Sequence, residues 1–193
     1  MEVLNEINTF YEKYSIEDPW EKAIFSKIKK MENDCRGKIG EIIVSNSLHK
    51  FSDLFFNLDI SDINKHEDGI YDLKINNKRI EVKTSCHTAA FCWQHEPLYK
   101  ENKCDIIIFI DFTYNSFYIS YCLDEELPLG KDNEPLFGKK HGTLRKNKDD
   151  GYKLDFSRAT IKKLIENNRC KEFSDKTNYD EIANFLRGVF DLK

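Results

Sequence analysis

The spacing of hydrophobic residues changes several times along the chain, and each change predicts a new element. After Asp18, which has the chemistry of a helix N-cap, apolar residues recur at helical spacing and predict a helix over residues 19–31. The segment RGKIGEIIVSNSLHKF, residues 36–51, predicts a second helix because its large apolar residues can share one broad face. These residues are Ile39, Ile42, Ile43 and Leu48.

Between residues 63 and 85 the apolar period becomes two, the repeat of a β-strand, and Asn76 and Asn77 interrupt it. This pattern predicts a hairpin whose turn is centred on the two asparagines, so that Asp72 lies directly opposite Glu81. Strand alternation then separates charged from apolar side chains. The predicted charged face holds Asp72, Lys74, Arg79, Glu81 and Lys83, and the predicted core face holds Tyr71, Leu73, Ile80 and Val82.

Two more strands are predicted in CDIIIFIDFTYNSFYISYCL, residues 104–123, joined near residues 114–116. The nearly continuous apolar run in the first of them is typical of a central strand covered on both faces. Residues 124–150 are rich in Gly, Pro, Asn, Asp and Lys, which predicts a long basic loop or insertion. A helix capped by Ser157 and a C-terminal helix over residues 180–190 complete the pattern.

This order of helices, strands and helices predicts an α/β (α+β) fold with a central mixed β-sheet of four or more strands, flanked by helices. A length of 193 residues predicts one domain over residues 1–193. The composition, 40% hydrophobic and 33% charged, excludes wholesale disorder. Neither a membrane-spanning run nor a secretory signal is evident, so we expect a cytoplasmic protein that has no membrane partner and whose six cysteines are reduced.

Charge is unevenly distributed along the chain, which carries a formal net charge of −4. The segment GKKHGTLRKNK, residues 138–148, contains five lysines or arginines, one histidine and no acid. Charge alone allows two readings, a solvated loop or a surface that binds nucleic acid. The candidate DNA-binding residues are Lys139, Lys140, His141, Arg145, Lys146 and Lys148.

The predicted hairpin also suggests chemistry. Two facing carboxylates repel each other unless a positive charge lies between them, and a hard divalent cation accepts such oxygen ligands. Lys83 is predicted on the same face, where an ammonium could assist an attacking water and offset the charge of a phosphate. Together these groups suit phosphodiester hydrolysis. The alternative is a solvated surface hairpin in which Lys74 and Arg79 pair with the two acids.

The segment YDLKINNKRIEVKTS, residues 71–85, resembles the core of the PD-(D/E)xK nuclease superfamily, although Tyr71 replaces the proline of the motif. The resemblance covers about residues 37–112. It implies a restriction endonuclease-like core in which Asp72 and Glu81 bind Mg²⁺, Mn²⁺ being able to substitute. It further implies that the Val82 carbonyl is an additional ligand, that Lys83 assists the water, and that Glu41 is the acid on the preceding helix.

Neighbouring residues offer weaker candidates. Asp68 competes with Asp72 as a metal ligand and is a possible outer ligand. Gln94 resembles a glutamine that members of the nuclease family carry after the Glu-x-Lys strand. The cysteines and histidines of CHTAAFCWQHEPLYK, residues 86–100, lack the spacing of known structural zinc sites. Trp20 and Trp93 could stack on bases, but a role in the core is the simpler prediction for both.

The sequence therefore predicts a Mg²⁺-dependent DNA endonuclease, similar to compact type II restriction enzymes, that cuts double-stranded DNA. Since one such site cuts one strand, a homodimer is expected. Two alternatives stay open: a nuclease for repair, junction resolution or mobile-element processing on the same fold, and a catalytically inactive DNA-binding domain.

Overall fold

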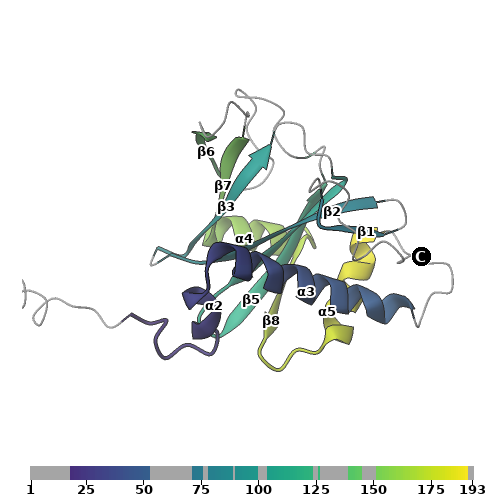
Figure 1. The fold of residues 1–193 in the computed structure, drawn as a ribbon, viewed down its shortest axis with the longest axis horizontal. Helices are drawn as coiled ribbons and strands as arrows, with labels where there is room; N and C mark the ends of the chain where they lie inside the picture. The colour runs from purple at the N-terminus through teal and green to yellow at the C-terminus, as the bar shows by residue number, and fades with distance from the viewer. Residues whose placement is uncertain are drawn as a thin grey trace, which may run out of the picture.

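The structure, a computed structural model, describes residues 18–52, 71–75, 78–88, 90–99, 104–123, 126, 139–144 and 151–190. Figure 1 shows their arrangement. The helices are α2 (Ser26–Lys30), α3 (Asn33–Ser52), α4 (Arg158–Glu166), α5 (Tyr179–Arg187) and the 3-10 turn η2 (Gly188–Phe190). The strands are β1 (Leu73–Ile75), β2 (Lys78–Cys86), β3 (Cys92–Tyr99), β4 (Ile106–Phe112), β5 (Ser116–Leu123), β6 (Lys139–Leu144), β7 (Gly151–Ser157) and β8 (Cys170–Ser174).

The strands form two sheets. The larger has the order β1-β2-β4-β5-β8, in which β2 and β4 are parallel and all other neighbours are antiparallel. This mixed five-stranded sheet flanked by helices confirms the predicted fold class. The smaller sheet has the order β3-β7-β6 and is antiparallel throughout.

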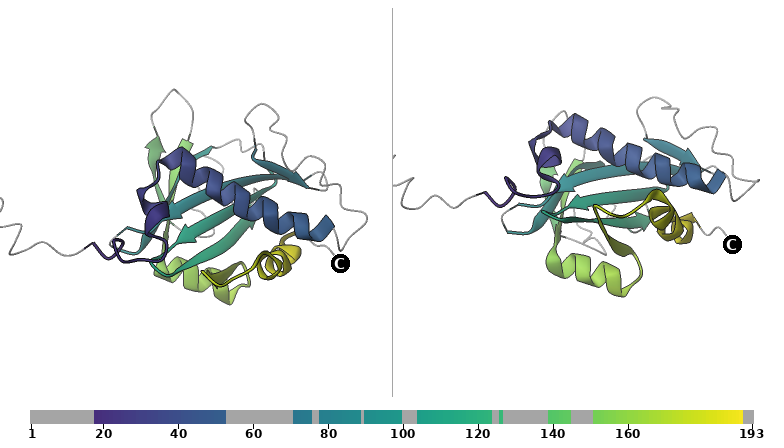
Figure 2. Two further views of the ribbon diagram at one scale, coloured as in Figure 1. Left: turned by 60° about the horizontal axis from the view of Figure 1, so that its bottom comes forward. Right: turned by 90° about the horizontal axis from the view of Figure 1, so that it is seen from below.

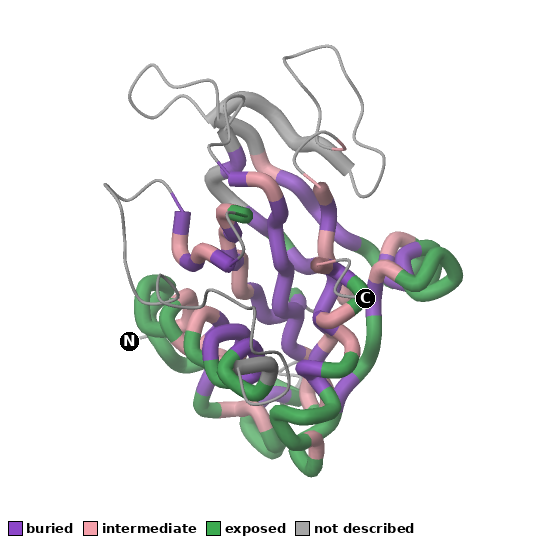
Figure 3. The backbone as a smooth tube through the Cα atoms, turned by 90° about the vertical axis from the view of Figure 1, so that its right-hand side faces the viewer, coloured by how far each residue is buried: buried purple, intermediate pink, exposed green. Residues whose placement is uncertain are grey.

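The larger sheet lies between two layers, with α3 on one face and α4 on the other (Figure 2). Every residue of β4 is buried, which confirms it as the central strand, and alternate residues of β4 enter two different cores (Figure 3). Ile108 belongs to the core shared with α2, α3 and α5, whereas Phe109 belongs to the core shared with β3, β7 and α4. Burial of such side chains stabilises the fold by about 1.5–3 kcal/mol each.

The first helix is shorter than the sequence predicts. Only Ser26–Lys30 is α-helical, and residues 18–25 consist of turns and an irregular position. The Asp18 carboxylate does accept a hydrogen bond from the backbone N–H of Trp20 (3.0 Å), but a local turn rather than a helix follows. Trp20 and Ile28 are buried but Ile24 is 54% exposed, so the apolar spacing did not mark one continuous buried face.

The smaller sheet was missed by the sequence analysis. Residues 92–99 form β3, and within the predicted 124–150 loop residues 139–144 form the strand β6. Strand β8 was missed as well. Strands β3 and β7 pair residues about sixty positions apart, so no local turn signal links them.

The C-terminal elements agree with the sequence. Ser157 caps α4: its Oγ accepts from the Thr160 N–H, and the Thr160 Oγ1 accepts from the Ser157 N–H, each at 3.2 Å.

Trp20 and Trp93 are both core residues, as predicted. All six cysteines are free thiols. Among the described helices, none has the length and apolar character that crossing a membrane requires.

Candidate active site

The three paired positions of the hairpin have the predicted register, but the predicted direct pair of Asp72 with Glu81 is not among them. Leu73 pairs with Ile80, and Ile75 pairs with Lys78, which leaves two residues for the connection. Leu73, Ile80 and Val82 are buried, as expected for the core face. Tyr71 is a correction, because it packs in the core on the opposite face of the sheet. The regular pairing ends at Leu73, so strand alternation no longer fixes the side of the residues before it.

Asp72 lies at this end of the pairing, and two hydrogen bonds hold it against β2. Its N–H donates to the Ile80 carbonyl (2.9 Å), and its carboxylate accepts from the Val82 N–H (2.7 Å). The N–H and C=O of one strand residue point to the same side, so the Val82 carbonyl is directed toward the edge where Asp72 lies. The resemblance to the nuclease family predicts that this carbonyl is a metal ligand.

A pocket of about 560 Å³ opens along β2 beyond the end of β1. It brings together candidates that come from α3, the hairpin and β3. The predicted residues that line it are Glu41, Asp72, Glu81, Val82, Lys83 and Gln94. The structure therefore assembles every predicted catalytic residue, and Gln94 with them, around one cavity.

Glu41 reaches the pocket because α3 packs closely on β2. A Cβ atom added to Gly40 would overlap the Thr84 hydroxyl and lie 3.3 Å from a Val82 methyl carbon, so only glycine permits this approach. The Glu41 carboxylate forms an ion pair with Lys38 one turn earlier, with Nζ and Oε2 2.5 Å apart. The helix thus places one acid beside the strand that carries the other candidates.

The acids of the pocket influence one another. The pKa of Asp72 is raised to about 6, first because burial disfavours its charged form and second because Glu81 lies nearby. Glu41 raises this pKa further, whereas the Val82 N–H and Lys83 lower it. Lys83 pairs directly with Glu81, with Nζ and Oε1 2.5 Å apart. A cation bound beside Asp72 would therefore offset the burial and the repulsion that raise its pKa.

Arg79 does not neutralise this site. Its guanidinium pairs instead with Asp105, with Nε and Oδ2 3.2 Å apart, and its backbone N–H donates to the same carboxylate oxygen at 2.7 Å. Asp105 precedes β4, so this pair helps to fix the parallel register of β2 and β4. This part of the solvated-hairpin alternative is wrong, because Arg79 has another partner.

Two residues beneath the pocket were undervalued by sequence reasoning. His95, which also lines the pocket, is 2% exposed, and its Nε2 lies 3.1 Å from an oxygen of the fully buried Asp111. Burial raises the pKa of Asp111, while His95 lowers it. The available signal was a single acid inside the otherwise apolar strand IIIFIDF.

The basic segment is only partly described. Lys139, Lys140 and His141 lie in β6, whereas Arg145, Lys146 and Lys148 lie outside the described residues, as does Asp68. In the backbone register Lys139 pairs with Asp155, which in turn pairs with Gln94. Lys139, Asp155 and Gln94 therefore lie side by side across the smaller sheet, and they connect β6 to a residue that lines the pocket.

The described residues contain no group of three or more His, Cys, Asp or Glu side chains that could hold a metal ion by themselves. The described residues among 86–95 likewise contain no such group that could hold a zinc ion. The pocket instead offers a pair of acids, Asp72 and Glu81, with the Val82 carbonyl. Mg²⁺ is usually held by one or two carboxylates, and water and substrate oxygens complete its coordination, so this donor set fits that ion.

Comparison of the chain with known protein families, curated proteins and solved structures finds no match.

Proposed function

We propose that this protein is a Mg²⁺-dependent endonuclease that hydrolyses phosphodiester bonds of DNA. One observation carries the proposal: α3, the residue before β1, and β2 direct Glu41, Asp72, Glu81 and Lys83 into one pocket. Three acids and an amine in this arrangement have a clear use in phosphoryl chemistry and little use in stability. The similarity to the PD-(D/E)xK motif, with Tyr71 in place of proline, agrees with this function.

Asp72, Glu81 and the Val82 carbonyl would hold the ion. When bound, Mg²⁺ supplies a water of lowered pKa and neutralises charge on the phosphate. Without it, the folded chain keeps Asp72 next to Glu81 at the cost of the raised pKa described above. The raised pKa thus supports a cation as the ligand of these acids, and Mn²⁺ has the charge and ligand preference to substitute.

Lys83 has the role of assisting the attacking water. Its side chain is 20% exposed and its ammonium is paired with Glu81, so it has a fixed place beside the pocket rather than a mobile surface position. From there it can donate a hydrogen bond to the water and offset charge that develops on the phosphate. Glu41, from the helix side, would orient a water in the same cavity.

The rest of the substrate surface is proposed from the smaller sheet. Lys139, Lys140 and His141 of β6, together with Arg145, Lys146 and Lys148, would contact DNA phosphates, which provide sequence-independent affinity. Since the chain has one such pocket among its described residues, cutting both strands calls for a homodimer. The likeness to type II restriction enzymes makes linear duplex DNA the proposed substrate, in the cytoplasm.

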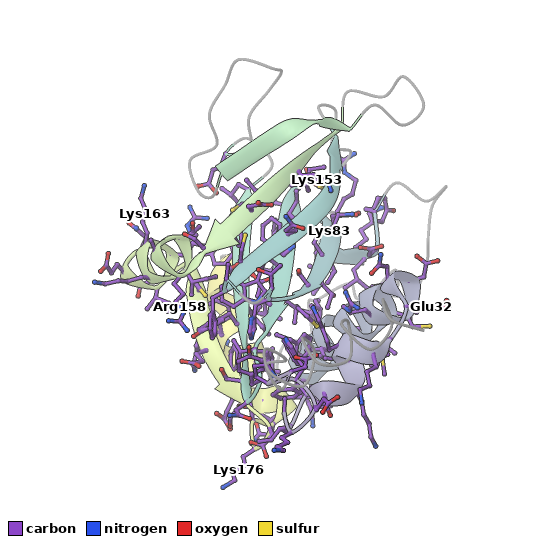
Figure 4. All side chains as sticks on the ribbon, turned by 90° about the vertical axis from the view of Figure 1, so that its left-hand side faces the viewer. Glu32, Lys83, Lys153, Arg158, Lys163 and Lys176 are labelled. Atoms are coloured by element: carbon purple, nitrogen blue, oxygen red, sulfur yellow. The ribbon has the colours of Figure 1, made fainter. Side chains whose placement is uncertain are left out.

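The decisive experiment incubates supercoiled plasmid with the protein and Mg²⁺ and compares the wild type with Lys83→Ala. We expect the wild type to cleave and Lys83→Ala to cleave about 100-fold more slowly. Lys176→Ala removes the same charge from an exposed turn on another part of the surface and should cleave like the wild type (Figure 4). Equal cleavage by Lys83→Ala would exclude Lys83 from the mechanism, and an inactive wild type would refute the endonuclease.

The Glu81–Lys83 ion pair also favours a second candidate, a catalytically inactive DNA-binding domain, because it partly neutralises the site without a metal. Calorimetric titration with Mg²⁺ or Mn²⁺ separates the two. The endonuclease predicts metal binding that Glu81→Ala abolishes, whereas the binding domain predicts no heat signal from either protein.

A further inference from the structure

A second pocket, of about 680 Å³, lies between α4 and the larger sheet. The residues of α4 that line this pocket are spaced three to four positions apart, as residues on one face of a helix are. This helix wall consists of Arg158, Ile161, Lys162, Ile165 and Glu166. The opposite wall is mainly aromatic and consists of Phe91, Trp93, Tyr114 and Tyr118 with Thr113, Asn115 and Ser116.

The rim of this pocket carries a guanidinium that lies over an aromatic ring. The Cζ atom of Arg158 lies 3.5 Å from the centroid of the Phe91 ring. On the other side of that ring, the buried His87 is stacked in parallel, with ring centroids 4.4 Å apart and an interplanar angle of 7°. Arg158 is exposed, yet its contact with the Phe91 ring gives the guanidinium a preferred position before any ligand arrives, which lowers the entropy cost of binding.

The backbone is strained where it makes this platform. Phe91 has φ = 51°, in the left-handed region that a bulky residue rarely adopts. Its N–H donates to the Thr88 carbonyl at 2.9 Å and closes a tight turn. Thr88 lines the first pocket and Phe91 lines the second, so this one turn separates the two cavities. Such strain persists only where surrounding contacts hold it, and it concentrates at functional sites.

The charge of Arg158 is not neutralised within the described part of the chain, where no ion pair or hydrogen bond engages its guanidinium. Lys162, one turn later, faces Glu166 at 3.8 Å, an exposed pair that gives little stabilisation. In Figure 4 Arg158 lies at the start of α4, on the side of the molecule that also presents Lys83 and Lys153. An uncompensated, planar cation beside an aromatic wall fits a ligand with an anionic group and a flat apolar group.

We infer that this pocket binds an unpaired nucleotide, with its base against the aromatic wall and its phosphate at Arg158. Aromatic side chains and arginine planes are the groups on which proteins stack single-stranded bases. The substrate assignment rests on the proposed nuclease function: one nucleotide of the duplex, next to the cleavage position, would leave the base stack and enter this pocket. Binding itself needs neither metal nor cleavage.

The test measures fluorescence anisotropy of labelled oligo(dT) of twelve nucleotides and of a labelled duplex of equal length, both in EDTA. We expect the single strand to bind at least about fivefold more tightly than the duplex, and Arg158→Gln to weaken single-strand binding about tenfold. Arg158→Lys keeps the charge but loses the planar guanidinium. Its affinity for the single strand should therefore lie between those of the wild type and Arg158→Gln. Lys171→Gln is the matched control, because Lys171 also lies over a phenylalanine, Phe173, at 5.3 Å, but outside this pocket.

A second measurement locates the ligand. The chain has two tryptophans, so Trp20→Phe leaves the emission of Trp93 alone, and oligo(dT) should quench it. Equal affinity for single and double strands, an unaffected Arg158→Gln, or no quenching of Trp93 would each overturn the inference. The two proposals fail separately: plasmid cleavage without single-strand preference refutes only this pocket, and single-strand binding by a protein that never cleaves refutes only the nuclease.

Discussion

At the scale of single residues, the site depends on small groups in fixed places. Asp72 has its raised pKa because it is partly buried beside Glu81, while one backbone N–H offsets part of that cost. The hairpin register alone predicted that Glu81 lies near Asp72. It could not predict the hydrogen bond from Val82, because that bond requires Asp72 to leave the regular ladder.

Asp72→Asn should stabilise the metal-free protein at neutral pH. The pKa of Asp72 is about 6 when folded and 3.8 as the ordinary value, so the folded protein binds the proton more tightly, and the free energy of unfolding falls as pH rises through this interval. Asparagine keeps an oxygen for the Val82 N–H but removes the charge. In EDTA at about pH 8 we expect a gain of about 1 kcal/mol, and at about pH 4 no gain.

Urea unfolding of both proteins at the two pH values measures this difference. The same Asp72→Asn protein should not cleave plasmid. A variant that is less stable than the wild type at the higher pH would contradict the electrostatic account of this site.

Gly40→Ala should disturb the packing of α3 on β2. The new methyl group would overlap the Thr84 hydroxyl, so the helix must move, at a cost of about 1–3 kcal/mol. Because Glu41 is the next residue, cleavage should fall as well. Gly37→Ala is a control in the same helix: its Cβ meets nothing within 4 Å, and alanine should stabilise the helix by about 0.5–1 kcal/mol. Thermal unfolding of both variants checks the contrast, and similar losses would argue against close packing at Gly40.

At the scale of elements, local signals predicted some structures well and others poorly. The strand β4, apolar except for Asp111, and the hairpin β1–β2 follow from composition and period, and each has the expected register or burial. The β3–β7–β6 sheet did not follow, because its pairs join residues far apart in the chain. The contact of Arg158 with Phe91 was out of reach for the same reason.

Ser157→Ala should weaken α4 at its first turn. The serine hydroxyl accepts from the Thr160 N–H, and its loss leaves a helix-end donor without this partner. We expect a loss of about 1 kcal/mol in the free energy of unfolding, measured with urea. Ser157→Asp keeps an acceptor at the cap and should retain most of the stability. Equal losses in both variants would show that the hydroxyl does more than cap the helix.

At the scale of the whole molecule, two cores on opposite faces of one sheet hold the pocket between them. Residues from α3 approach β2 from one side, and residues of β3 approach it from the other. Neither core alone would assemble the site, so the predicted fold class was necessary for the function but did not define it. The missing information was the second sheet, which carries Gln94 and His95.

Added Mg²⁺ should raise the thermal stability of the whole chain, because only the folded protein brings Asp72 and Glu81 together. With a dissociation constant of about 1 mM, about 10 mM MgCl₂ would add about 1.4 kcal/mol to the free energy of unfolding. Glu81→Gln should abolish this gain. Scanning calorimetry of the two proteins with MgCl₂ or NaCl of equal ionic strength provides the comparison, and an equal shift in the variant would mean that the ion acts elsewhere.

The brevity of β1 has a consequence for how this protein could evolve. It has three residues, so among the described residues the adjacent edge of β2 from Val82 onward faces a cavity rather than another strand. Lengthening β1 would add backbone hydrogen bonds and fill that opening. If the proposed nuclease function holds, selection for a more robust fold and selection for catalysis therefore oppose each other at this edge, and a stabilised descendant with a longer hairpin should be inert.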